Sequence, residues 1–177
     1  NVVGQARIHR AALPLLIAAA EQGRSPRVLV IGSEAGRQTA QPTNGLYGMS
    51  KQAVDAYGDA LRRELALLDI GVTTVEPGPF ASDMTAGIEQ GYLDATPEDS
   101  PFADLMAVAA ESAAKADSTS GDPAELADAV HEAATADDAP IRITVAHHRG
   151  RKLLDMLPMK LADRLVIGGL RRKIAKR

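Results

Sequence analysis

Residues 27–33 have the sequence RVLVIGS, a run of branched apolar side chains that ends in a glycine and a serine. Such a run predicts a strand buried on both faces of a sheet. Residues 71–75, GVTTV, predict a second strand, which ends before Pro77 because proline cannot donate to a sheet ladder. A helix between two strands makes a connection long enough for parallel pairing with a right-handed crossover. The chain therefore predicts an α/β fold with a parallel sheet.

The segment between these strands predicts a helix with a tyrosine and a lysine on one face. Residues 34–46 are rich in Gly, Pro, Asn, Gln and Thr and predict a loop, with Asn44 as the N-cap of a helix that runs to about Asp69. Tyr47 and Lys51 are four residues apart, so their side chains share one helical face. That face continues toward the core as a stripe formed by Val54, Gly58, Leu61 and Leu65.

The tyrosine-lysine pair predicts acid-base chemistry. A free phenol has a pKa of about 10, too high for efficient proton transfer at neutral pH. A nearby ammonium favours the phenolate and lowers that pKa toward the useful range. A lysine at the head of an apolar stripe is costly to bury without a partner or a ligand, which favours a functional role. Because ligands of parallel sheets bind outside the carboxyl ends of the strands, Ser33, the pair and the Pro77-Gly78 turn should converge there.

Four spaced elements together resemble the short-chain dehydrogenase/reductase family. They are Asn1-Val2-Val3-Gly4 before a helix, Ser33, Tyr47-x-x-x-Lys51 after thirteen intervening residues, and Pro77-Gly78 after the next strand. The match also covers Leu13-Pro14 and Leu61-Arg62-Arg63-Glu64-Leu65. The resemblance implies the C-terminal part of a Rossmann-type doubly wound parallel sheet, with about three parallel strands and flanking helices, followed by a helical C-terminal tail.

The resemblance implies an Asn-Ser-Tyr-Lys tetrad that works with a nicotinamide cofactor, either NAD or NADP. Tyr47 would be the general acid or base, and Ser33 would hydrogen-bond the substrate oxygen as charge develops on it. Lys51 would lower the phenol pKa and bond the nicotinamide ribose, while Asn1 would hold a water of the proton relay. The cofactor carboxamide would contact the segment after the second strand, at Pro77, Gly78, the backbone of Phe80, and Ser82.

The implied activity is that of an NAD(P)-dependent oxidoreductase, which moves hydride between nicotinamide and a small alcohol or ketone substrate. The family's long helices, which here would begin near Asn1 and Tyr47, usually form subunit contacts, so a homodimer or homotetramer is implied as well. The alternative is a non-catalytic interaction protein that keeps the fold without turnover. The presence of Asn1, Ser33, Tyr47 and Lys51 argues against it, since a scaffold would tolerate the loss of any one of them.

The chain departs from the family pattern at its beginning. Its fifteen glycines contain no G-x-G-x-x-G or G-x-x-x-G-x-G run, the loop that binds the pyrophosphate. The chain also starts on Asn1, and its first motif belongs to the middle of the family's fold. We therefore expect a fragment that lacks the N-terminal cofactor-binding half and is inactive alone, the enzyme being the parent protein.

Composition agrees with one α/β domain and separates two charged regions. The 177 residues are 45% apolar, contain no cysteine and have no apolar run long enough to span a membrane, and we expect a cytoplasmic protein. Residues 83–138 hold fourteen acids and one base, a net charge of −13, whereas residues 139–177 hold two acids and eleven bases, a net charge of +9. Nucleic-acid binding has little support, because the basic segment lacks interleaved aromatic residues.

Residues 1–148 should form the partial dehydrogenase domain. Within it, residues 82–120 are expected to be a substrate-loop region with short helices, or alternatively a solvated insertion. The sequence GDPAE at residues 121–125 predicts a helix start with Asp122 as N-cap. Residues 141–145 alternate and predict an edge strand.

Residues 149–177 predict a basic amphipathic helical tail, interrupted at Pro158. It would pack on its own domain or on a sister subunit, and the alternative is attachment to an anionic membrane surface. A metal site is not expected at His147 and His148, because adjacent side chains point apart and neither His9 nor His131 has a suitably spaced carboxylate partner.

Overall fold

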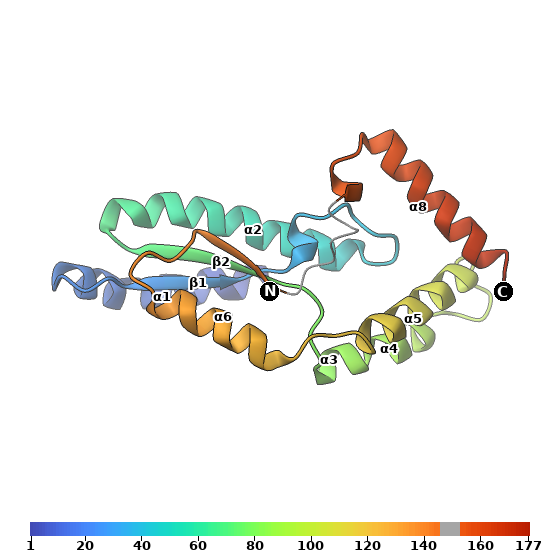
Figure 1. Cartoon of the computed structure of the whole chain (residues 1–177), viewed down its shortest axis with the longest axis horizontal. Coiled ribbons are helices and arrows are strands. Elements are labelled where there is room, and N and C mark those ends of the chain that lie inside the picture. Colours follow the sequence, from blue (N-terminus) through green and yellow to red (C-terminus); the bar gives the residue numbers. More distant parts are fainter. Residues whose placement is uncertain (146–152) are drawn as a thin grey trace. The chain divides into compact units, whose positions relative to one another are not determined.

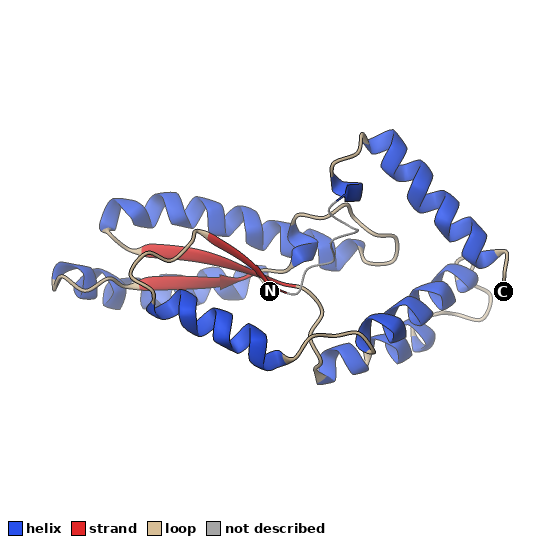
Figure 2. Cartoon of the chain, in the orientation of Figure 1, coloured by secondary structure: helices blue, strands red, loops and turns tan. Residues whose placement is uncertain are grey.

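A computed structural model of the protein describes residues 1–145 and 153–177, and within them three strands form one parallel sheet (Figures 1 and 2). The strands are β1 (Arg27–Ile31), β2 (Gly71–Pro77) and β3 (Arg142–Val145), in the order β1-β2-β3. Val28 pairs with Val72, and Val75 pairs with Ile143. The predicted parallel α/β sheet is confirmed, and β2 extends two residues beyond the predicted stretch, to Pro77.

Helices make up most of the remaining described chain. They are α1 (Val2–Glu21), α2 (Gly45–Leu65), α3 (Asp83–Ala86), α4 (Ile88–Asp94), α5 (Ala103–Asp117), α6 (Pro123–Thr135) and α8 (Met159–Ile174), with short 3-10 turns η1 (Glu34–Gly36) and η2 (Ala66–Leu68). The chain divides into two compact units. The first unit comprises residues 1–40, 44–78 and 124–147, and the second comprises residues 41–43, 79–123 and 148–177.

The core of the first unit lies between the sheet and the predicted stripe of α2. Val54, Gly58, Leu61 and Leu65 of that stripe are all buried, as expected. The three apolar side chains of this stripe pack in a cluster with the sheet residues Val28, Val30 and Val72 and with Ile70. Figure 1 shows the sheet between α2 and α6. The helix that carries Tyr47 and Lys51 is therefore fixed along one face of the sheet.

A glycine in the middle of α2 permits this close packing. A Cβ atom at Gly58 would lie 2.8 Å from Thr74 Oγ1 and 3.4 Å from Val30 Cγ1. The first distance is well inside van der Waals contact, so a larger residue would push the helix away from β1 and β2. At its other end α2 gives way to η2, and the chain turns at Asp69 in the left-handed conformation with φ 55°.

The second unit is more helical than the sequence indicated. The region 82–120, which we expected to be a loop with short helices, contains the 15-residue helix α5. The glycines and prolines of the region lie outside residues 103–117, and these residues are rich in alanine, a strong helix former. Pro158 is the N-cap of α8, as the expected interruption of the tail implied. Within the same unit, Lys173 Nζ of α8 donates to Ser112 Oγ of α5 at 3.4 Å.

The expected boundary between residues 148 and 149, together with His147 and His148, lies outside the described residues. Among the helices of residues 1–145 and 153–177, none combines the length and the apolar character that crossing a bilayer requires.

Candidate active site

Ser33 lies directly after β1, at the carboxyl edge of the sheet. The Gly32 N–H donates to Val75 O at 2.8 Å, which extends the pairing with β2 by one residue. Ser33 is only 9% exposed, and its Oγ accepts a hydrogen bond from the Ala35 N–H at 3.2 Å as the cap of η1. Because the serine hydroxyl accepts this bond, its own hydrogen remains available for a ligand oxygen.

Lys51 lies next to the same edge, on the first half of α2. Its Nζ donates to Gly32 O at 2.9 Å and lies 5.9 Å from the centroid of the Tyr47 ring. Burial lowers the pKa of Lys51, because a partly desolvated ammonium is less stable than a solvated one. The partner that we expected a buried lysine to need is therefore a backbone carbonyl. An ammonium has three N–H donors, so Lys51 can also bond a ligand hydroxyl.

Asn1 approaches α2 beside the tyrosine-lysine pair. Its Nδ2 donates to Ser50 Oγ at 3.4 Å, and Ser50 Oγ in turn donates to Tyr47 O at 2.8 Å. Asn1, Ser33, Tyr47 and Lys51 all belong to the first unit. Ser50 was not among the predicted site residues. The one sequence signal that could have identified Ser50 is its position between Tyr47 and Lys51.

The predicted cofactor contacts after β2 fall in two places. Pro77 ends β2, and the Gly78 N–H donates to Val145 O at 2.8 Å, so the turn is anchored to β3. Phe80 and Ser82 belong to the second unit. There Phe80 is 8% exposed and forms a bridge with Gly121. Ser82 is the N-cap of α3 and forms a capping box with Thr85.

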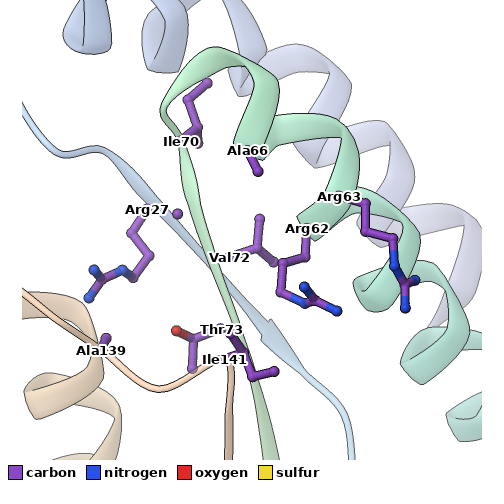
Figure 3. A pocket seen from close by; sticks show the side chains of 10 residues that line it. Arg27, Arg62, Arg63, Ala66, Ile70, Val72, Thr73, Ala139 and Ile141 are labelled. Carbon is purple, nitrogen blue, oxygen red and sulfur yellow. The ribbon is translucent and has the colours of Figure 1, made fainter.

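A cavity of about 440 Å³ lies at the opposite edge of the sheet, where β1 and β2 begin (Figure 3). It is lined by Arg27, Arg62 and Arg63 among other residues, and by none of the predicted site residues. Figure 3 shows the side chains of Arg27 and Arg63 pointing away from each other. Arg27 Nη1 donates to Ala133 O and Ala136 O at 2.7 and 2.9 Å. Because its arginines do not converge on one point, this cavity is not the candidate active site.

The part of the chain that the structure describes contains no group of side chains that could bind a metal ion. No three His, Asp or Glu side chains among residues 1–145 and 153–177 are placed to hold an ion. His9 instead stacks on Tyr57, with Nδ1 3.0 Å from the phenol oxygen. Burial lowers the pKa of His9, which favours its neutral form.

The chain is similar in sequence to named reductases and dehydrogenases. The chain is 37% identical over 91 residues to an NADPH-dependent 3-dehydrocapnine reductase of Ornithobacterium rhinotracheale, covering 51% of this chain and 32% of that protein. It is 40% identical over 85 residues to retinol dehydrogenase 5 of Homo sapiens, covering 48% of this chain and 24% of that protein. The chain thus matches a third or less of these relatives' length.

Solved structures extend the likeness to almost the whole chain. A short-chain dehydrogenase from Streptomyces avermitilis has 25% identity and a TM-score of 0.60, and the match covers 99% of this chain and 56% of that one. A short-chain dehydrogenase/reductase from Burkholderia phymatum in complex with NAD shares the fold at 18% identity, with a TM-score of 0.61, over 96% of this chain and 53% of that one. The family model for short chain dehydrogenase matches residues 1–93. Since this match covers more than half of its residues, the chain belongs to the short-chain dehydrogenase family.

Proposed function

We propose that the protein containing this chain is an NAD(P)-dependent oxidoreductase that acts on a carbonyl or alcohol carbon. The observation that carries the proposal is the position of Lys51, whose Nζ is bonded to Gly32 O at 2.9 Å and lies 5.9 Å from the Tyr47 ring centroid. This places an ammonium beside a phenol at the carboxyl edge of a parallel sheet, where such folds bind ligands. One relative is named an NADPH-dependent reductase, and one structural neighbour is in complex with NAD, which supports a nicotinamide cofactor.

The residues of this chain fit the nicotinamide end of such a cofactor. Lys51 has N–H donors for ribose hydroxyls, and the Pro77-Gly78 turn offers backbone groups for the carboxamide. The contacts expected at Phe80 and Ser82 stay predictions. These 177 residues contain no G-x-G-x-x-G loop that could bind the pyrophosphate end of the cofactor. When bound, the nicotinamide supplies or accepts the hydride.

The side chains of the chain would handle the proton. In the reductive direction Tyr47 gives its phenolic proton to the substrate oxygen, and in the oxidative direction it takes that proton back. Ser33 donates its free hydroxyl hydrogen to the same oxygen, since its Oγ already accepts from the Ala35 N–H. Lys51 would bond the nicotinamide ribose beside Tyr47, and Asn1 would hold the water through which the proton reaches solvent.

We also propose that α1 forms part of a subunit contact. No residue of this 20-residue helix is buried, and Ile8 and Leu15 are 68% and 76% exposed. These two side chains are seven positions apart and therefore lie on the same face of the helix. A second copy of the protein would cover them in a homodimer or homotetramer.

The first test removes one hydroxyl from the site. The protein for this test includes any residues that the reading frame encodes before Asn1 or after Arg177. The assay follows NAD(P)H oxidation in the presence of each member of a panel of aldehydes and ketones. We expect Tyr47→Phe to lower kcat by about 10²- to 10⁴-fold, the range typical of a lost general acid. Tyr57→Phe, which removes a hydroxyl from the same helix, should keep the wild-type rate. An unchanged rate in Tyr47→Phe would refute the mechanism, whereas no turnover by the wild type would favour a non-catalytic interaction protein.

The isolated 177 residues provide a second arm of this test. Because they contain no glycine-rich phosphate loop, we expect them neither to bind NADPH or NADH at micromolar concentration nor to turn over. Isothermal calorimetry with each cofactor measures the binding directly. Micromolar binding would show that residues other than a glycine-rich loop hold the phosphates.

A further inference from the structure

A partly buried ion-pair network lies beside the candidate active site, and none of its members is among the predicted site residues. Its centre is Arg142 of β3, whose Nη1 donates to Asp55 Oδ1 and to Glu76 Oε1. The Nη2 of the same guanidinium donates to Asp59 Oδ1 at 3.2 Å. Thr144 Oγ1 also donates to Glu76 Oε2, at 3.0 Å. Arg142 therefore joins three carboxylates from α2 and β2.

The burial of this network makes it costly to disturb. Glu76 is 5% exposed, and the side chains of Arg142 and Asp55 are each 17% exposed. A buried carboxylate is stable only when it is paired and hydrogen-bonded. Removing one partner of a buried pair leaves an uncompensated charge, which a protein relieves by moving the remaining group toward water. Loss of Arg142 should therefore shift the segments that hold Asp55 and Glu76.

These two carboxylates lie next to residues of the candidate active site. Asp55 is one helical turn beyond Lys51 on α2, and Glu76 directly precedes Pro77. The Gly78 N–H is bonded to Val145 O, three residues after Arg142 on the same strand. A single guanidinium thus ties the helix of Tyr47 and Lys51 to the end of β2.

We propose that Arg142 is a positioning residue for the cofactor site. It holds α2 and the end of β2 at the spacing that lets Lys51 and the Pro77-Gly78 turn engage one nicotinamide nucleoside. It acts through Asp55 and Glu76 and touches neither cofactor nor substrate. This inference rests on the proposed oxidoreductase function.

The test compares two arginines that both fasten a strand. Arg142→Met removes the network, whereas the control Arg27→Met removes bonds to Ala133 O and Ala136 O at the opposite edge of the sheet. We expect Arg142→Met to raise the KM for NADPH or NADH by about 10- to 100-fold, as for a misplacement of about 1 Å, with a smaller change in kcat. The KM for the carbonyl substrate should change little. Arg27→Met should lower the melting temperature without raising the cofactor KM.

A readout that does not depend on turnover accompanies the kinetics. In Arg142→Met the Gly78 amide, which is bonded to Val145 O, should exchange with solvent faster than in the wild type. The Gly71 amide, bonded to Pro26 O at the other end of β2, should keep its wild-type rate. If Arg142→Met does not fold, Glu76→Gln, which keeps the shape and removes the charge, should give the same two changes.

The outcomes separate this inference from the proposed function. Suppose that Tyr47→Phe abolishes turnover, while Arg142→Met keeps the wild-type cofactor KM and the wild-type Gly78 exchange rate. The positioning role of Arg142 is then overturned, and the oxidoreductase function stands. If the wild type shows no turnover that depends on Tyr47, the proposed function fails. In that case Gly78 exchange alone decides whether Arg142 holds the turn.

Discussion

Lys51 links the candidate active site to the stability of the fold. Burial lowers the pKa of its ammonium in the folded protein, while in the unfolded chain the pKa returns to about 10.4. Between the lowered value and about 10.4 the unfolded chain binds more protons than the folded chain, so this group makes the free energy of unfolding rise with pH. The upper limit of this pH window is the ordinary lysine pKa of about 10.4.

We therefore expect the free energy of unfolding of Lys51→Met to rise less with pH than that of the wild type. The measurement is the urea midpoint of the wild type and of Lys51→Met at several pH values from about 7 to about 10, the range that leads up to the ordinary lysine pKa. The difference between the two proteins should shift in favour of the wild type as pH increases. Lys115→Met serves as the control for a change at a lysine in the second unit. Parallel curves for wild type and Lys51→Met would contradict the effect of burial.

Among the predicted site residues, Tyr47 and Lys51 are the two whose relation follows from local geometry. Tyr47 and Lys51 could be placed together because an α-helix determines where residues four apart lie. The acceptor for Lys51 is a backbone oxygen 19 residues away, which no side-chain pattern identifies. Arg142 finds its carboxylate partners 66, 83 and 87 residues away. The alternation of residues 141–145 predicted a strand there but carried no signal for the network.

At the scale of elements, the placement of α2 depends on contact between its backbone and the sheet. We expect Gly58→Ala to destabilise the protein by about 1–3 kcal/mol, because the new Cβ would lie 2.8 Å from Thr74 Oγ1 and force the helix outward. Gly48→Ala is the matched control, since a Cβ there meets no atom within 4 Å and alanine favours the helix by about 1 kcal/mol. Urea unfolding monitored by circular dichroism measures both changes. Equal stabilities for the two variants would show that the helix can yield at no cost.

The elements themselves followed from sequence patterns to different degrees. The strand at residues 27–31 was predictable from its continuous run of branched apolar side chains. The strand at residues 142–145 and the apolar stripe of α2 were predictable from the period of their side chains. The helix α5 was not, because the breaks around residues 103–117 drew attention to loops, whereas the alanine-rich stretch between them has strong helix propensity.

At the scale of the whole molecule, apolar surface that the described chain leaves uncovered should govern its behaviour in solution. Within residues 1–145 and 153–177, β1 pairs only with β2, so its other edge offers unpaired backbone groups. One face of α1 packs against the core through partly buried side chains, while Ile8 and Leu15 are exposed on another face. Uncovered apolar patches of this kind promote association between chains.

We therefore expect the 177-residue chain to associate as its concentration rises, which light scattering coupled to size-exclusion chromatography would detect as an increase in apparent mass. The double substitution Ile8→Lys and Leu15→Lys should reduce this increase, because two ammonium groups would have to be desolvated in the contact. Met84→Lys, at a residue 66% exposed in the second unit, is the control and should leave the association unchanged. If the double substitution has no effect while association persists, the α1 face is not the contacting surface. The open edge of β1 is then the next surface to test, since unpaired strands pair through their backbones regardless of helix side chains.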